Sequence, residues 1–194
     1  MGVIKTALEI ALEKTEQVKG DKSSIDQFES KQRGKKLANA FLAGEVNLAD
    51  EIKSAASGQR ESLKQGIFDV LISQVALPAG KEDEKRIDAV GKGLGVIINN
   101  SRFTAMYKQL TQLFSQYLQE AAHYDQAIRQ QYAPKLRQKE EELSRRLGRD
   151  VHIDPFQDPE FVAFYNQHMT ALKGNYEALV EQTKEEARRL FESE

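Results

Sequence analysis

The chain has 194 residues, with 28 Lys and Arg against 30 Asp and Glu, so its formal net charge is −2. This balance gives no general attraction to nucleic acid or to anionic lipid, and the absence of cysteine excludes disulfides, thiolate metal sites and cysteine nucleophiles. The high content of charged residues, with only four prolines, favours helices over sheets. No apolar run approaches the roughly 20 residues needed to cross a bilayer, and a chain without cysteine fits a reducing compartment. We therefore expect a cytoplasmic protein that does not enter the membrane.

Two amphipathic segments open the chain. Residues 3–19 carry apolar or small side chains at alternating steps of three and four, which predicts one helix face. Gly20 is predicted to end this helix, and Ser24 to cap the start of a second helix that ends at Gly44. The stripe of the first helix consists of Ile4, Leu8, Ala11, Thr15 and Val18.

The next two helices are predicted from their caps and stripes. Asn47 is a suitable N-cap for a helix whose apolar residues recur at steps of three and four, as in coiled coils. The sequence Pro78-Ala79-Gly80 is predicted to end this helix. Gly66 within it would kink the helix or let a neighbour approach. A further helix is predicted from the acids at 82–84 to the break at 99–101. Its glycines at 91 and 95 stand one turn apart, which favours close packing over a phosphate loop, because no strand precedes them.

The last hundred residues predict a helical hairpin. A helical stripe runs from Ser101, and Pro134 should bend or break that helix because proline lacks an N–H and clashes with the preceding turn. The pattern resumes and continues to Gly148. Asp158-Pro159-Glu160 is a strong start for a final helix. We expect the last two helices to pair antiparallel through the loop at 148–158.

Together these elements predict an all-α fold of five or six helices, a bundle of long helices with a C-terminal antiparallel helical hairpin. We expect a single helical domain over residues 1–194, with a possible subdivision into N-terminal helices at 1–77 and C-terminal helices at 81–194. No strand signal rivals the helical patterns.

One metal-binding pattern occurs on a predicted helix. Glu120 and His123 are three residues apart and therefore share a face, as in the Glu-x-x-His pairs of di-metal helical bundles. Such bundles need two of these pairs and two further glutamates, and the second pair is missing. Metal binding by Glu120 and His123 thus stays an alternative, and we predict no cofactor and no catalytic residue.

Basic and aromatic residues suggest surfaces for binding. Two basic clusters offer contacts to phosphates, but acids flank or interrupt both, so nucleic-acid binding is a lesser alternative. The aromatic residues gather in the last hundred residues, where most should pack between helices. We expect a surplus at Tyr107, Tyr132 and Phe164 to form a partner surface. The basic clusters are Lys31, Arg33, Lys35 and Lys36, and Arg137, Lys139, Arg145, Arg146 and Arg149.

The opening Ile4-Lys5-Thr6-Ala7-Leu8-Glu9-Ile10-Ala11-Leu12-Glu13-Lys14, followed by Lys31-Gln32-Arg33-Gly34-Lys35-Lys36-Leu37-Ala38, resembles the N-terminal segment of a small family of uncharacterised bacterial proteins. The resemblance covers about the first third of the chain. It implies a bacterial and cytoplasmic origin, and it transfers no activity and no functional residue.

These observations predict a non-enzymatic interaction or scaffold protein that acts through helix–helix surfaces, with an unidentified protein partner or as a homo-oligomer. The alternatives are a helical-bundle protein that binds a metal or small ligand, and a nucleic-acid-associated protein.

Overall fold

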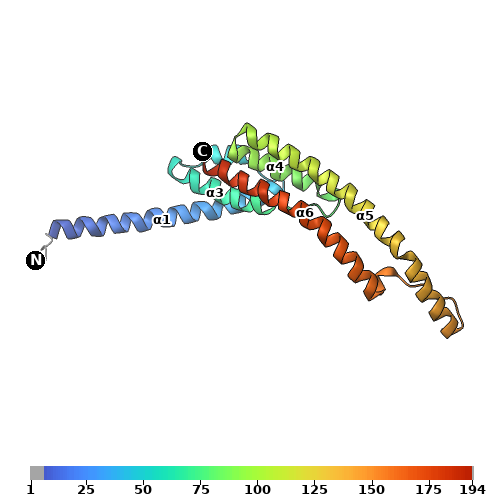
Figure 1. Cartoon of the computed structure of the whole chain (residues 1–194). Helices are drawn as coiled ribbons and strands as arrows, with labels where there is room; N and C mark the ends of the chain where they lie inside the picture. The colour runs from blue at the N-terminus through green and yellow to red at the C-terminus, as the bar shows by residue number, and fades with distance from the viewer. Residues whose placement is uncertain (1–6, 194) are drawn as a thin grey trace, which may run out of the picture. The chain divides into compact units, whose positions relative to one another are not determined.

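The computed structural model describes the backbone of residues 7–193 and the side chains of residues 24–193 (Figure 1). This part of the chain is all-α, as predicted, and contains no strand. No helix in it is long and apolar enough to cross a membrane. The six α-helices are α1 (Ala7–Leu42), α2 (Leu48–Ser54), α3 (Ser57–Ser73), α4 (Glu84–Ile98), α5 (Ser101–Leu147) and α6 (Pro159–Glu192), and the short 3₁₀ turns are η1 (Lys81–Asp83) and η2 (Pro155–Gln157).

The chain forms two compact units. The first contains the residues up to Val75 together with Arg86–Asn100, and therefore helices α1 to α4. The second contains 76–85 and 101–193, and therefore α5 and α6. The Pro78-Ala79-Gly80 break does separate two helices, but α4, which follows it, packs with the helices that precede it.

Helix α1 is longer than the sequence predicts. It continues from Ala7 to Leu42 in one piece, so the predicted end at Gly20 and the predicted cap at Ser24 are wrong. A glycine inside a helix costs only about 1 kcal/mol, and no proline removes a hydrogen bond here. The predicted start at residue 3 lies outside the described residues. The end is correct, because Gly44 has a φ of +79°, the left-handed conformation that closes helices.

The predicted helix after Asn47 is two helices. Asn47 caps α2 as expected, since its side chain accepts a hydrogen bond from the amide of Ala49. The chain then turns extended at Ala55, and the Arg60 guanidinium donates to the carbonyls of Ile52 and Ala55 at 3.2 and 3.1 Å. A side chain from the next helix thus satisfies the carbonyls at the end of α2. The stripe alone did not reveal this break.

Two glycines bring α1 and α3 into backbone contact. A Cβ added at Gly66 would collide with the carbonyl group of Lys31, and one added at Gly34 would collide with the carbonyl oxygen of Leu63 and lie 3.1 Å from the Gly66 Cα. Each glycine therefore faces the backbone of the other helix. The prediction that Gly66 admits a close neighbour agrees with this geometry.

Helix α4 completes the core of the first unit. Its apolar stripe is buried as predicted, and the close approach occurs at Gly93. A Cβ there would meet the side chains of Leu71 and Phe41 at 2.7 and 2.8 Å, whereas a Cβ at Gly95 would meet nothing within 4 Å. The glycine-rich segment is thus a helix-packing feature, though at a different glycine from those expected. The buried α4 residues are Ile87, Val90, Gly93, Leu94, Ile97 and Ile98.

Helices α5 and α6 form the predicted antiparallel hairpin. Helix α5 continues through Pro134 for 47 residues, about 70 Å, so the proline does not end it. Gly148, with a φ of +66°, closes α5. Near the open end of the hairpin Arg102 pairs with Glu186 at 2.8 Å, and towards the loop the Tyr132 and Phe161 rings lie 5.2 Å apart.

Candidate interaction surfaces

A polar cluster around the buried carboxylate of Asp158 fixes the start of α6 against α5. Asp158 caps α6, since its carboxylate accepts from the amide of Glu160 at 3.1 Å. The same carboxylate accepts from Lys139 at 2.8 and 2.9 Å and from the hydroxyl of Tyr132 at 3.0 Å. Lys139 and Lys135 also bind the carboxylate of Glu160, at 3.0 and 2.7 Å. Asp158 is only 5% exposed, so these partners replace the water that it loses on folding.

The charges of this cluster stay fixed near neutral pH. Burial alone would raise the pKa of Asp158, but the hydrogen bonds from Lys139 and Tyr132 outweigh it and the pKa is lowered. The pKa of Lys139 is raised by its hydrogen bond to Asp158, and the pKa of Tyr132 is raised by burial and by the same carboxylate. Hydrogen bonds from Lys135 and Lys139 lower the pKa of Glu160 to about 2. None of these groups is poised to exchange a proton at pH 7. The cluster acts as a clamp between helices.

The sequence identified the cap of this clamp but not its partners. Asp158 was recognised because a capping acid, a proline and a second acid follow one another along the chain. Lys139 was assigned to a basic cluster, and nothing in its neighbourhood indicates that a carboxylate 19 residues later would bind it.

The aromatic residues predicted to form a partner surface lie mostly inside. Tyr107 and Tyr132 are 8% and 7% exposed, so the expectation that they offer a surface is wrong. Tyr107 packs near the ring of Phe103 at 5.6 Å, and Tyr132 belongs to an apolar cluster with Phe161. Phe164 is half-buried against that cluster, with its ring 4.6 Å from His168. The packing of Tyr132 and Phe164 in this cluster of α5 and α6 residues explains their burial.

The possible metal ligands are not brought together with others. Glu120 and His123 are both exposed residues of α5. Burial raises the pKa of Tyr176 on α6, and so does the hydrogen bond that its hydroxyl donates to Glu120. In residues 24–193, where side chains are described, no group of three potential His, Asp or Glu ligands occurs. His152 is apart from them and lies 2.8 Å from Glu140.

Several residues of the two basic clusters are engaged by acids. Lys31 pairs with Asp69 at 2.8 Å, and Arg33 with Glu51 at 3.2 Å. In the second cluster Lys139 belongs to the Asp158 clamp, and the other pairs join residues one turn apart on α5. These are Arg145 with Glu141 at 4.0 Å and Arg146 with Glu142 at 2.6 Å. Acids thus offset much of the charge that a phosphate backbone would meet.

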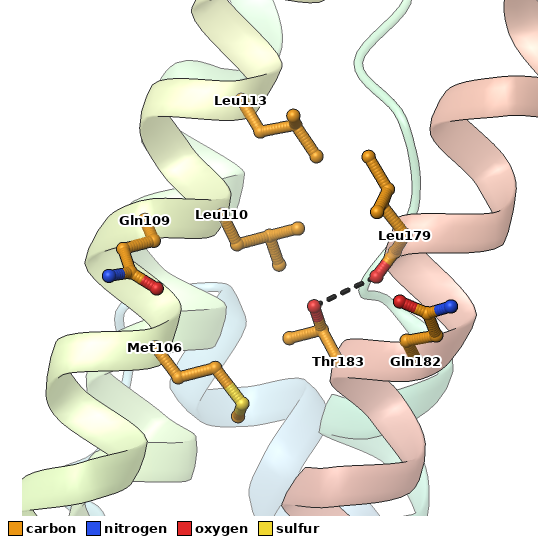
Figure 2. Close-up of a pocket in the computed structure, with 7 residues that line it drawn as sticks. All are labelled: Met106, Gln109, Leu110, Leu113, Leu179, Gln182 and Thr183. Atoms are coloured by element: carbon orange, nitrogen blue, oxygen red, sulfur yellow. Dashed lines mark hydrogen bonds between the residues drawn. The ribbon is translucent and has the colours of Figure 1, made fainter.

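An open groove runs between α5 and α6. Figure 2 shows Leu110 and Leu113 of α5 facing Leu179 of α6, with Met106 below them. The groove has a volume of about 290 Å³, and Leu179 remains 43% exposed within it. The hydroxyl of Thr183 donates to the carbonyl of Leu179 at 2.9 Å, so it offers no free donor to a ligand. The remaining lining residues are Gln109 and Gln182. We call this feature the α5–α6 groove.

Three further apolar side chains are exposed at the end of α5 and in the hairpin loop. Leu143 and Leu147 at the end of α5 are 38% and 56% exposed, and Phe156 in the loop is 46% exposed. A hollow of about 390 Å³ lies beside Leu143, next to Asp158. The guanidinium of Arg129 covers Phe156 at 5.0 Å from the ring centre. The wall of this hollow includes the clamp, so its shape depends on the clamp remaining closed.

Comparison with known proteins gives one match. No curated protein and no solved structure is detectably similar to this chain. A family model matches residues 49–189, which extend from α2 to near the end of α6. The matched region begins after the N-terminal segment on which the resemblance in the sequence was based. The chain belongs to a family of unknown function (DUF6657).

Proposed function

We propose that this protein is a non-enzymatic helical interaction or scaffold protein, and that the α5–α6 groove binds a protein partner. The observation that supports this is the apolar lining of an open groove. Leu110 is buried at its base, while Leu179 on its wall stays largely exposed. An apolar side chain left in water along a groove gains free energy when a partner covers it. Grooves of this kind between two helices suit the apolar face of a third helix.

The test uses a charge placed in the groove and a matched charge beside it. Leu179→Asp puts a carboxylate in the groove, and Ala178→Asp puts one on the adjacent exposed residue, about 100° round the same helix. A partner is first identified by photo-crosslinking from Gln182 in native cells. Leu179→Asp should weaken its binding at least about tenfold, and Ala178→Asp should leave binding unchanged. Equal binding by both variants would contradict the proposal.

We also propose that the protein acts in the cytoplasm of a bacterium. The chain has no cysteine, which fits a reducing compartment. Fractionation of a cell that expresses the native protein tests this, and recovery in a secreted or envelope fraction would contradict it.

A further inference from the structure

A hollow between α1 and α3 contains the most exposed apolar side chain described in the structure. Phe28 of α1 is 63% exposed, the highest value among the large apolar residues whose side chains are described. It lines a hollow of about 350 Å³, to which α3 contributes Glu61 and Ser62. Both helices belong to the first unit, so the hollow lies within one compact part of the chain. The remaining lining residues are Ser24, Gln27, Lys31 and Gln65.

The carboxylate of Glu61 in this hollow is open to a cation. Lys31, a base in the lining, lies 2.8 Å from the carboxylate of Asp69, which offsets its charge. Burial alone would raise the pKa of Asp69, but the hydrogen bonds from Lys31 and Gln65 outweigh it and lower the pKa. Glu61 is exposed, and no base among the residues with described side chains pairs with it.

The other polar side chains of the hollow can accept hydrogen bonds. The amide nitrogen of Gln65 donates to Asp69 at 2.9 Å, which leaves the amide oxygen of Gln65 to accept. The hydroxyls of Ser24 and Ser62 and the amide oxygen of Gln27 are acceptors as well. A guanidinium has five N–H donors in one plane, so it suits several acceptors around an aromatic ring better than an ammonium does.

The hairpin shows how this chain holds a guanidinium of its own. The guanidinium of Arg129 lies 5.0 Å from the centre of the Phe156 ring and donates to the carboxylate of Asp125 at 2.9 Å. An aromatic face and a carboxylate therefore hold one cation together. Phe28 and Glu61 provide the same two groups in the hollow. Within residues 24–193, no cation covers the ring of Phe28.

These contacts favour an arginine that another protein presents. A cation over an exposed ring and an exposed ion pair each change affinity only a few-fold, so free arginine would bind weakly. A protein that holds the arginine in place adds the contacts around it. Most arginines of this chain already bind acceptors within it, as Arg33 binds Glu51 and Arg60 binds the carbonyl of Ile52. A second copy of this chain is therefore not the expected source.

We propose that the hollow between α1 and α3 binds an arginine side chain of a protein other than this chain, with the guanidinium over the Phe28 ring and paired with Glu61. The α5–α6 groove lies in the second unit, so this inference goes beyond the proposed function and does not rest on it.

An NMR titration of the full chain tests the chemistry of the hollow. The probe is acetyl-arginine methylamide, and its control is the citrulline analogue, which has a similar shape but no charge. The arginine probe should shift the ring signals of Phe28, which are assigned from their absence in Phe28→Leu. The citrulline analogue should bind at least about fivefold more weakly, because it cannot form the charged contacts.

Two acids of the first unit make a matched pair for the same titration. Glu61→Gln should weaken binding of the arginine probe about threefold. Glu29→Gln removes an exposed acid of α1 that does not line the hollow, and it should leave binding unchanged. Equal binding of the two probes, or equal weakening by the two variants, would overturn the proposal. Circular dichroism of Phe28→Leu, Glu61→Gln and Glu29→Gln checks that the helices remain.

A double-mutant cycle tests whether a protein supplies the arginine. Photo-crosslinking from Ser62 in native cells first identifies the partner and the segment that enters the hollow. In the purified pair, Glu61→Gln and replacement of the partner's arginine by glutamine should each weaken binding at least about threefold. The double variant should bind no more weakly than either single variant, because both changes remove the same contact.

Four outcomes of the crosslinking and the cycle would overturn the proposal. These are additive losses in the cycle, a crosslinked segment without arginine, a crosslink to a second copy of this chain, and no crosslinked protein at all. None of them bears on the α5–α6 groove, because the comparison of Leu179→Asp with Ala178→Asp measures that surface independently. Conversely, loss of the groove partner leaves the hollow standing if the arginine probe binds and the cycle shows coupling.

Discussion

Replacing Gly66 with alanine should force α1 and α3 apart. The new Cβ would lie 2.9 Å from the carbonyl carbon of Lys31 and still closer to its oxygen, and backbone atoms cannot rotate out of the way as a side chain can. Overpacking of this kind costs about 1–3 kcal/mol, and we take the upper end because both contacting groups are backbone. Alanine has a higher helix propensity than glycine, which offsets about 1 kcal/mol of this cost. The net loss of stability is about 2 kcal/mol.

Thermal unfolding followed by circular dichroism measures this loss. A change of about 2 kcal/mol lowers the Tm of a chain of this size by about 6 °C. Gly95→Ala and Gly174→Ala are matched controls, because a Cβ at either position meets nothing within 4 Å. Both should raise the Tm by about 3 °C through helix propensity alone. If Gly66→Ala raised the Tm as the controls do, the close backbone contact would be wrong.

Three further predictions concern the hairpin. Asp158→Ala removes the cap of α6 and the partner of Lys139, so it should lower the free energy of unfolding in urea by about 3 kcal/mol. Glu142→Ala, which removes one partner of an exposed ion pair, is the control and should lower it by less than about 0.5 kcal/mol. The pKa of the Glu160 carboxyl is about 2 in the folded chain and higher in the unfolded chain, so the stability that its ionised form contributes is present above about pH 5 and is lost as the pH falls towards 2. The urea midpoint of the wild-type chain should therefore fall between about pH 5 and pH 2, and that of Glu160→Gln should fall less steeply. Pro134→Ala restores a helical hydrogen bond on an exposed stretch of α5, so it should raise the free energy of unfolding in urea by up to about 3 kcal/mol. A decrease would show that α5 requires the proline.

The sequence predicted the parts of the fold that local chemistry determines. Asn47 and Asp158 cap helices where the sequence places them, and Gly148 closes α5. Each of these signals acts over three or four residues. Gly20 failed as a stop because its cost is small and nothing else there ends the helix. The turn at Ala55 was missed because Arg60, in the next helix, supports it.

The candidate surfaces were harder to predict, because they depend on contacts between distant residues. The sequence suggests Tyr132 as an exposed aromatic residue, but its hydroxyl donates a hydrogen bond to Asp158, which is 26 residues away along the chain. Ile25 is apolar but 57% exposed, and only the position of α3, which contacts the Gly34 side of α1, shows which part of α1 is covered. A stripe identifies apolar positions, and the partner helix decides which of them are covered.

The order of the chain has a consequence for how the protein is made. Helix α4 belongs to the first unit, yet residues 76–85, which belong to the second, precede it. During synthesis the first unit therefore cannot close its core until the ribosome has released residue 100. No single cut separates the units either, because a chain that ends at Val75 lacks the helix that covers Phe41 and Leu71. A shortened protein must extend through Asn100 to keep its first unit whole.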